Sequence, residues 1–230
     1  RCEEILNQGY GGIKIYPLQK RTIDQAAICV SKIRQTLGFN IPLMLDLACP
    51  NDPNVSLKLA PLVKAFKPYW FEEPVDGEAT RTLIEIKNQT GLRIVTGEKQ
   101  CGINHFVETL AVDAVDIFNP DISSVGGIID MIKIIELSNK NNVRVSPHCW
   151  NSMSIAASAM VHLCMSFPNT EMAEFFPEYI PYTLKFCNKN FEINNGFIEL
   201  ENREGLGVII DTNLLMENTS SYKFSILDKN

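Results

Sequence analysis

Ionisable side chains recur along much of the chain, each at the end of a short apolar run. The series, in chain order, is Lys14, Asp46, Glu72, Glu98, Asp121, His148 and Glu174. The steps between them are 32, 26, 26, 23, 27 and 26 residues, which is about the length of one strand, one helix and their connections. Because parallel strands end at the same edge of a sheet, we expect these side chains to gather at one mouth.

Three successive members of this series, Asp46, Glu72 and Glu98, are carboxylates. Their mutual repulsion would be costly unless a cation lay between them. Oxygen ligands favour a hard ion, so we predict a site for Mg²⁺, with Mn²⁺ as the second choice. In the alternative interpretation these acids cap helices or form ion pairs in loops. That alternative does not explain why they recur in successive units.

His148 and Asp121 lie at the ends of neighbouring runs, one on each side of a helical segment. A carboxylate at one strand end can accept a hydrogen bond from an imidazole at the next. Such a bond selects one tautomer and makes the ring more basic. We therefore predict an acid/base pair, with a structural histidine bonded within a loop as the alternative.

Short apolar runs and helical patterns alternate up to about residue 180. The predicted strands span residues 12–16, 41–46, 69–72, 93–98, 115–119, 143–147 and 171–175. Apolar residues at helical spacing predict a helix from Ile23 to Leu37, ended by Gly38, and another from Ile128 to Leu137. Repeated strand–helix units predict an α/β fold with a parallel sheet, either open and doubly wound or closed into a barrel.

The composition of the chain argues against nucleic acids and membranes as binding partners. The 230 residues are 45% hydrophobic with a net charge of −6, which argues against a protein that binds the phosphate backbone of nucleic acids. No apolar run is long enough to span a membrane, and we expect no membrane partner. The seven cysteines contain no closely spaced pair, so we expect a reducing, cytoplasmic location without a disulfide framework.

The strand–helix alternation stops near residue 185, which divides the chain in two. We expect residues 1–184 to form the main (β/α) domain and residues 185–230 to form a tail of short strands and turns beside it. Because the chain opens on Arg1 and the first strand follows a helical stretch, we expect it to be cut from a longer protein.

The motifs together resemble the barrel domain of the enolase superfamily, in its mandelate racemase/muconate lactonizing enzyme group. The matching pieces are Gly-Ile-Lys14-Ile, Met-Leu-Asp46, Trp-Phe-Glu72-Glu73-Pro74, Thr-Gly-Glu98, Asn-Pro-Asp121-Ile-Ser-Ser-Val-Gly-Gly, Ser-Pro-His148-Cys-Trp, Ala-Glu174-Phe and Gly205-Leu206-Gly207-Val208. The likeness runs from about residue 9 to residue 210, and its specificity lies in the order and spacing of the motifs.

The resemblance implies a TIM-type (β/α) barrel that lacks its first strand and the N-terminal α+β capping domain. It implies that Asp46, Glu72 and Glu98 hold Mg²⁺, which binds a substrate carboxylate and stabilises the enediolate formed when a base removes the α proton. It further implies that Glu174 donates a hydrogen bond to the substrate carboxylate, and that the protein is a homo-oligomer.

One departure from the family pattern bears on the reaction. Relatives often carry Lys-x-Lys where this chain has Lys14-Ile15-Tyr16, so the second lysine base is absent. Tyr16 is left as a weaker acid/base or a positioning hydroxyl, and Lys14 as a neutraliser of carboxylate charge. A single strong base, His148, favours an enzyme of the lyase class, a hydro-lyase that dehydrates an acid sugar to a 2-keto-3-deoxy acid. The alternatives are a racemase or epimerase of a carboxylate and a catalytically silent, carboxylate-binding barrel.

Overall fold

The computed structural model describes residues 1–150 and 154–218. Six parallel strands form one sheet in sequence order, β1-β2-β3-β4-β5-β6. Their bounds are β1 Ile13–Ile15, β2 Leu43–Asp46, β3 Trp70–Glu72, β4 Ile94–Thr96, β5 Ile117–Phe118 and β6 Arg144–Val145. Each lies inside a predicted strand, so the α/β class and the parallel sheet are confirmed.

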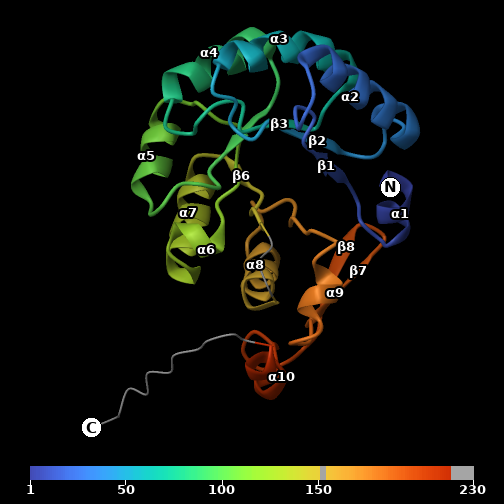
Figure 1. Ribbon diagram of the computed structural model, residues 1–230. Helices are drawn as coiled ribbons and strands as arrows, with labels where there is room; N and C mark the ends of the chain where they lie inside the picture. Colours follow the sequence, from blue (N-terminus) through green and yellow to red (C-terminus); the bar gives the residue numbers. More distant parts are fainter. Residues whose placement is uncertain (151–153, 219–230) are drawn as a thin grey trace.

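Helices connect successive strands and lie outside the sheet, where they form an arc around the strands (Figure 1). Before β1 comes α1 (Cys2–Asn7), and between β1 and β6 come α2 (Ile23–Leu37), α3 (Pro53–Val63), η1 (Lys64–Phe66), α4 (Thr80–Thr90), α5 (Asn104–Ala111), α6 (Ile122–Val125) and α7 (Ile128–Lys140). After β6 come α8 (Ser154–Ser166), α9 (Ile180–Thr183), β7 (Phe191–Asn194), β8 (Phe197–Leu200) and α10 (Thr212–Glu217).

The bounds of α2 coincide with its predicted bounds, and the local chemistry explains both ends. Thr22 and Gln25 form a reciprocal capping box at the start, which satisfies two free backbone N–H groups. Gly38 ends the helix with φ 69°, a backbone conformation that costs little only without a side chain.

The strands β2 to β5 are buried on both faces, and alternate residues point to opposite sides. One set, with Leu45 and Phe71 as examples, packs against the helices in the main core. The other set forms a small separate cluster on the concave face, made of Met44, Trp70, Val95 and Ile117. A residue two positions after a member of this inner cluster lies on the same concave face, closer to the carboxyl end of its strand.

The expected seventh strand at residues 171–175 is wrong. Thr170 forms only an isolated parallel bridge with Val145, through bonds from Val145 N to Asn169 O and from Glu171 N to Val145 O. The next backbone donor that the ladder needs is at residue 147, which is Pro147 and has no N–H. The segment therefore runs beside β6 without extending the sheet.

The segment after residue 185 contains a hairpin that the polar run at residues 188–195 concealed. β7 and β8 pair antiparallel around an Asn195-Gly196 turn with φ angles of 51° and 82°, the turn that a tight hairpin favours. The hairpin lies beside α1 (Figure 1), where Gly196 N donates to Gly9 O at 2.6 Å. The hairpin thereby contacts the segment that precedes β1.

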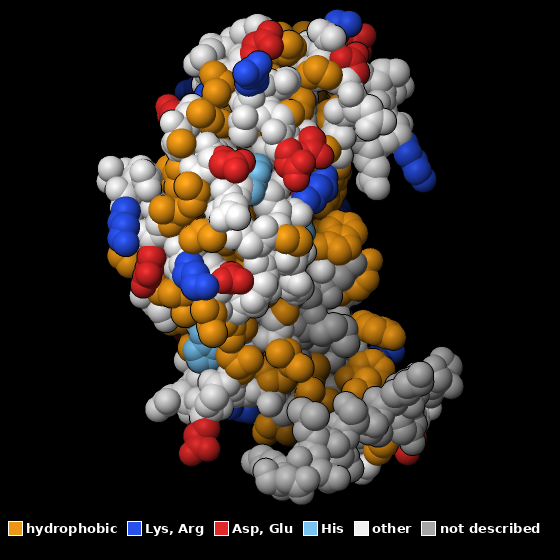
Figure 2. Space-filling model, turned by 90° about the vertical axis from the view of Figure 1, so that its left-hand side faces the viewer, with side chains coloured by type: hydrophobic (Ala, Val, Ile, Leu, Met, Phe, Trp, Pro, Cys, Tyr) orange, Lys and Arg blue, Asp and Glu red, His pale blue; other side chains and the backbone are white. Residues whose placement is uncertain are grey.

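Among the described residues, no helix is both long enough and apolar enough to cross a membrane. Figure 2 shows one side of the molecule, on which charged and hydrophobic side chains are interspersed, with hydrophobic side chains denser toward the lower end. Exposed apolar side chains on the outer helices include Val107, Ile128, Ile129, Ile155 and Met165.

Candidate active site

The strand alternation brings the predicted polar residues to one end of the sheet. Asp46 lies two residues after Met44, and Glu72 two residues after Trp70, so both follow members of the inner cluster. The parallel register places Asp46 directly opposite Glu72. Two carboxylates on neighbouring strands therefore lie side by side at the carboxyl ends of β2 and β3.

Glu98 completes a group of three carboxylates. One oxygen from each of Asp46, Glu72 and Glu98 lies within 4.8 Å of the others. Their side chains are only 3%, 1% and 14% exposed. None of the three caps the helix that follows it, because the N-cap residues of α3, α4 and α5 are Asp52, Ala79 and Ile103. The capping alternative therefore does not account for this cluster.

The surroundings of these carboxylates disfavour three negative charges. Burial raises the pKa of Glu72 to about 8, and the nearby charges of Asp46 and Glu174 add to the effect against the opposing Lys14. Burial likewise raises the pKa of Asp46 and of Glu98. The cluster thus holds protons more tightly than ordinary carboxylates do. A bound cation would stabilise the ionised carboxylates and so remove this preference for the protonated form.

A divalent cation fits the donor set. All three groups offer oxygen, the ligand that Mg²⁺ and Mn²⁺ prefer. In addition, Glu98 Oε2 is buried and makes no hydrogen bond to any described residue. Buried polar atoms are seldom left without a partner, so this oxygen is available to a ligand. Asp46, Glu72 and Glu98 are the residues that would hold the ion.

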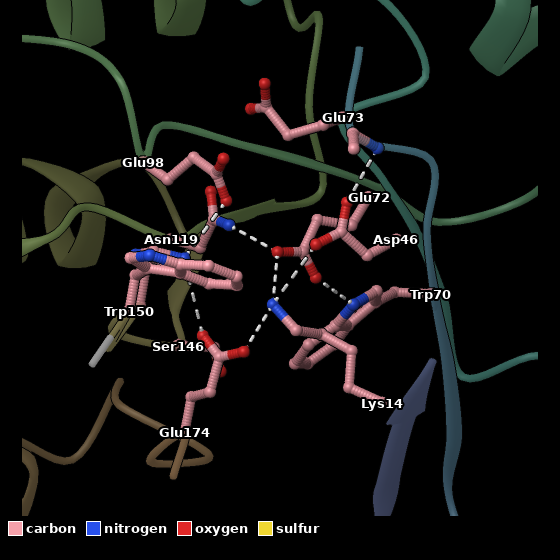
Figure 3. Close-up of polar contacts among 12 residues, drawn as sticks. Lys14, Asp46, Trp70, Glu72, Glu73, Glu98, Asn119, Ser146, Trp150 and Glu174 are labelled. Carbon is pink, nitrogen blue, oxygen red and sulfur yellow. Dashed lines mark hydrogen bonds and ion pairs between the residues drawn. The ribbon is translucent and has the colours of Figure 1, made fainter. Parts of the chain in front are cut away.

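Glu72 is held in place by three donors (Figure 3). Its Oε1 accepts from Lys14 Nζ at 2.7 Å and from Asn119 Nδ2 at 2.9 Å, and its Oε2 accepts from Trp70 Nε1 at 2.8 Å. The sequence interpretation assigned no role to Trp70 or Asn119. A signal for Asn119 was present, because it lies two residues after the inward-facing Ile117.

Lys14 lies among the carboxylates, as its position after an apolar run predicted. Its Nζ is 2.7 Å from Glu72, 3.5 Å from Asp46 and 2.5 Å from Glu174. Burial lowers the pKa of Lys14, but the three carboxylates outweigh it and hold that pKa well above its usual value. Lys14 is therefore a permanent cation that neutralises part of the cluster.

His148 and Asp121 form the expected pair. His148 Nδ1 lies 2.7 Å from Asp121 Oδ2, while the other oxygen of Asp121 accepts from Ser123 N and caps α6. These bonds outweigh burial and lower the pKa of Asp121. Burial lowers the pKa of His148, but its hydrogen bond to Asp121 and the charges of Glu174 and Glu98 outweigh burial, so the pKa is raised.

The free nitrogen of the imidazole is directed at the carboxylate cluster. His148 Nε2 lies 3.3 Å from Glu98 Oε2 and 3.8 Å from Glu174 Oε2. Glu174 also accepts from Cys149 N at 3.1 Å, so in this arrangement it is an acceptor from both sides. A basic group oriented by Asp121 thus stands next to a site suited to a metal ion.

Tyr16 and Glu73 differ in how they relate to this site. Tyr16 is half-buried near Lys14, and burial raises the pKa of its phenol, which keeps it protonated at neutral pH. Glu73, next to Glu72 in sequence, turns elsewhere: its carboxylate contacts Thr96 and Cys49. The structure therefore brings seven of the eight candidates into direct contact around one mouth, with Tyr16 at its margin.

Comparison with known proteins identifies the family to which this chain is similar. The model of the family described as enolase C-terminal domain-like matches residues 1–214. D-galactonate dehydratase from Pectobacterium atrosepticum is 28% identical over 209 residues, which is 87% of this chain and 54% of that protein. The chain thus spans about half the length of this curated relative.

Solved structures share the fold. The crystal structure of an enolase from the environmental genome shotgun sequencing of the Sargasso Sea is 47% identical, with a TM-score of 0.90 over 94% of this chain and 57% of that one. L-talarate dehydratase from Polaromonas sp. JS666, in a complex with Mg and L-glucarate, is 24% identical with a TM-score of 0.79 over 93% of this chain and 57% of that one.

Proposed function

The chain belongs to the enolase superfamily, in the C-terminal domain family of the mandelate racemase/muconate lactonizing enzyme group, and from this premise we propose that it carries the active-site residues of a Mg²⁺-dependent acid-sugar dehydratase. In this proposal it abstracts the proton α to a carboxylate and expels the β-hydroxyl, giving a 2-keto-3-deoxy acid. The observation that carries the proposal is the position of His148 Nε2, 3.3 Å from Glu98 Oε2. A base and a candidate metal ligand are thereby adjacent.

The base in this reaction is neutral His148. Its Nδ1–H donates to Asp121 Oδ2, which leaves the lone pair on Nε2 facing the cluster. Nε2 takes the α proton, and the electron pair of the C–H bond moves toward the carboxylate. Mg²⁺, held by Asp46, Glu72 and Glu98, would supply a positive charge that stabilises the developing negative charge on the carboxylate oxygens.

The second half of the reaction uses the same histidine. The imidazolium formed by the first step gives its proton to the β-hydroxyl, which leaves as water while the Cα–Cβ double bond forms. The resulting enol becomes the 2-keto-3-deoxy acid by moving one proton to the β-carbon. Since one residue serves as base and then as acid, both groups leave from the same face of the substrate.

Lys14 and Glu174 flank this chemistry. Lys14, in contact with Glu72, Asp46 and Glu174, keeps a positive charge beside the place where the substrate carboxylate would bind. Glu174 lies between Lys14 and His148 and orients both. A two-base racemase finds less support, because the raised pKa of Tyr16 leaves its phenol protonated and unable to act as a base at neutral pH.

The proposal is tested with the complete natural protein, loaded with Mg²⁺ and incubated with a panel of acid sugars. We expect 2-keto-3-deoxy products from at least one of them, and loss of product with His148→Asn while Mg²⁺ still binds. His105→Asn is the matched control, because His105 lies on α5 and bonds with Thr109. Exchange of the α proton with inversion and without dehydration would establish an epimerase instead. No turnover with Mg²⁺ bound would leave a carboxylate-binding barrel.

A further inference from the structure

Four aromatic rings form a continuous series beside the acid/base pair, which we term the aromatic wall: Tyr16, Trp150, Phe176 and Tyr179. Tyr16 and Trp150 meet edge to face with ring centroids 6.4 Å apart. Trp150 and Phe176 meet at 4.9 Å, and Phe176 and Tyr179 at 6.2 Å, again edge to face. This is the arrangement that aromatic pairs prefer, so the rings support one another.

Two neighbouring members of the wall, Trp150 and Tyr16, lie close to site residues in the chain. Trp150 lies two residues after His148, and its backbone N–H donates to Asp121 Oδ2 at 3.5 Å. Tyr16 lies two residues after Lys14, immediately after the end of β1. In the view of Figure 3 the Trp150 ring extends toward the carboxylate groups, with Glu98 on one side and Glu174 on the other. The wall is thus one border of the space that a substrate would occupy.

The aromatic wall exposes apolar ring surface to solvent. Trp150 is 54% exposed although its backbone contacts the buried Asp121, and Tyr179 is 46% exposed. By contrast, Trp70, whose indole N–H serves Glu72, is only 5% exposed. Binding sites for small molecules combine a few polar groups with apolar and aromatic surface, and the C–H groups of a sugar chain pack well against an indole.

The wall carries no positive charge of its own. Among the residues that the structure describes, cation–π contacts involve Phe39, Tyr69 and Tyr182 and none of the wall's four rings. The two lysines nearest the carboxylate cluster are already paired, Lys14 with Glu72 and Glu174 and Lys99 with Glu73. Lys189 lines a pocket together with Phe176 and Tyr179, but it is paired with Glu192. A second carboxylate at the far end of a substrate would therefore meet mainly apolar surface here, where an anion is costly.

Building on the proposed function, we propose that the Trp150 ring packs against the C–H face of the substrate's carbon chain, and that the site takes a monocarboxylate acid sugar in preference to a dicarboxylate. Trp150 is then a specificity-determining residue. Its removal affects binding of the carbon chain more than it affects the proton transfer at His148.

Matched pairs of six-carbon acids test this on the complete, Mg²⁺-loaded protein: D-galactonate with galactarate, D-gluconate with D-glucarate, and D-mannonate with mannarate. Within each pair only the second carboxylate differs. We expect at least one monoacid to bind at least tenfold more tightly than its diacid, measured by calorimetry. We also expect a change in tryptophan emission that disappears in Trp150→Phe, while that variant keeps most of the affinity because it keeps a ring.

Trp150→Gln removes the ring and should weaken monoacid binding at least tenfold, with a smaller change in turnover at saturation. Unchanged monoacid binding in Trp150→Gln, equal or tighter binding of the diacids, or no binding by any of the six overturns the inference. Binding that depends on Trp150 without formation of product would overturn the dehydratase function and leave the packing role standing. Since Trp150 is largely exposed, thermal unfolding of both variants verifies that they fold.

Discussion

Lys14 Nζ lies 2.5 Å from Glu174 Oε1, so the first strand of the sheet and the segment that follows α8 meet at the site. β1 is one edge of the sheet, and Glu174 lies beyond the last parallel bridge, at Thr170. The two ends of the strand series are therefore joined at the mouth by an ion pair. The same ammonium group also contacts Glu72 and Asp46, which makes it central to the charge balance.

Replacing Lys14 by Met should destabilise the metal-free protein. Removing one partner of a buried ion pair leaves the other charges uncompensated, at a cost of about 3–5 kcal/mol. Chemical denaturation at neutral pH measures the loss, and Mg²⁺ should restore part of it. Lys133→Met is the control, because Lys133 forms an exposed pair with Asp130 on α7, which contributes about 0–1 kcal/mol. Equal effects of the two substitutions would contradict the central role of Lys14.

The metal-free protein should lose stability as the pH rises through the range in which Glu72 ionises. The folded state raises the pKa of Glu72 from 4.5 to about 8, so the folded protein binds this proton more tightly than the unfolded chain does. The free energy of unfolding therefore decreases as the pH rises from the lower to the higher of these values. A pKa shift of this size corresponds to a decrease of roughly a few kcal/mol.

Denaturant titrations at several pH values, with and without Mg²⁺, check this dependence. Glu72→Gln should flatten the profile, and so should Mg²⁺, because both remove the cost of ionising the group. Glu171→Gln replaces a less deeply buried carboxylate near Arg144 and Arg93 and should leave the Mg²⁺ effect intact. A profile that is already flat in the metal-free wild type would refute the prediction.

Asn119→Leu should weaken Mg²⁺ binding without unfolding the protein. The change removes the amide that donates to Glu72 Oε1 at 2.9 Å, and loss of such a partner typically lowers metal affinity about 10- to 100-fold. Calorimetric titration with Mg²⁺ measures it. Asn169→Leu is a matched control, because its amide donates to Ile135 O and its loss should affect stability alone. Identical Mg²⁺ affinities in the two variants would exclude this role for Asn119.

The pH–rate profile should report the His148–Asp121 pair. Burial lowers the pKa of His148, but Asp121, Glu174 and Glu98 outweigh it and raise that pKa above 6.5. A base must be neutral to act, so the acid limb of kcat/KM should lie above that value. Asp121→Asn removes a carboxylate that favours the imidazolium. The limb should then move to lower pH, and the plateau should fall by about 10²- to 10⁴-fold.

Asp116→Asn tests whether the effect is specific to the site. Asp116 lies just before β5 and accepts from Ile94 N, so its loss concerns the fold and should leave the position of the limb unchanged. An acid limb that stays in place in Asp121→Asn would show that another group titrates.

Local patterns in the sequence were sufficient to locate the six strands of the parallel sheet and the polar residues at their ends. Apolar runs with a helical period between them identify strand–helix units, and the alternation of side chains along a strand then decides which residues face inward. On this basis Asp46, Glu72 and Lys14 could be assigned to one face. Motif order then led to the family, which the match over residues 1–214 confirms.

The tertiary structure decided what no local pattern specifies. The register that sets Asp46 opposite Glu72 depends on how the helices pack between the strands, and it determines which carboxylates are neighbours. The bond from Asn119 to Glu72 and the contact of Lys14 with Glu174 join residues far apart in the chain, and the last bridge before Pro147 joins Val145 to Thr170. The sequence by itself determines the helical or strand period of a segment and the face on which each side chain lies, because both depend only on local backbone geometry. Distance across the mouth follows only from the twist and packing of the whole sheet.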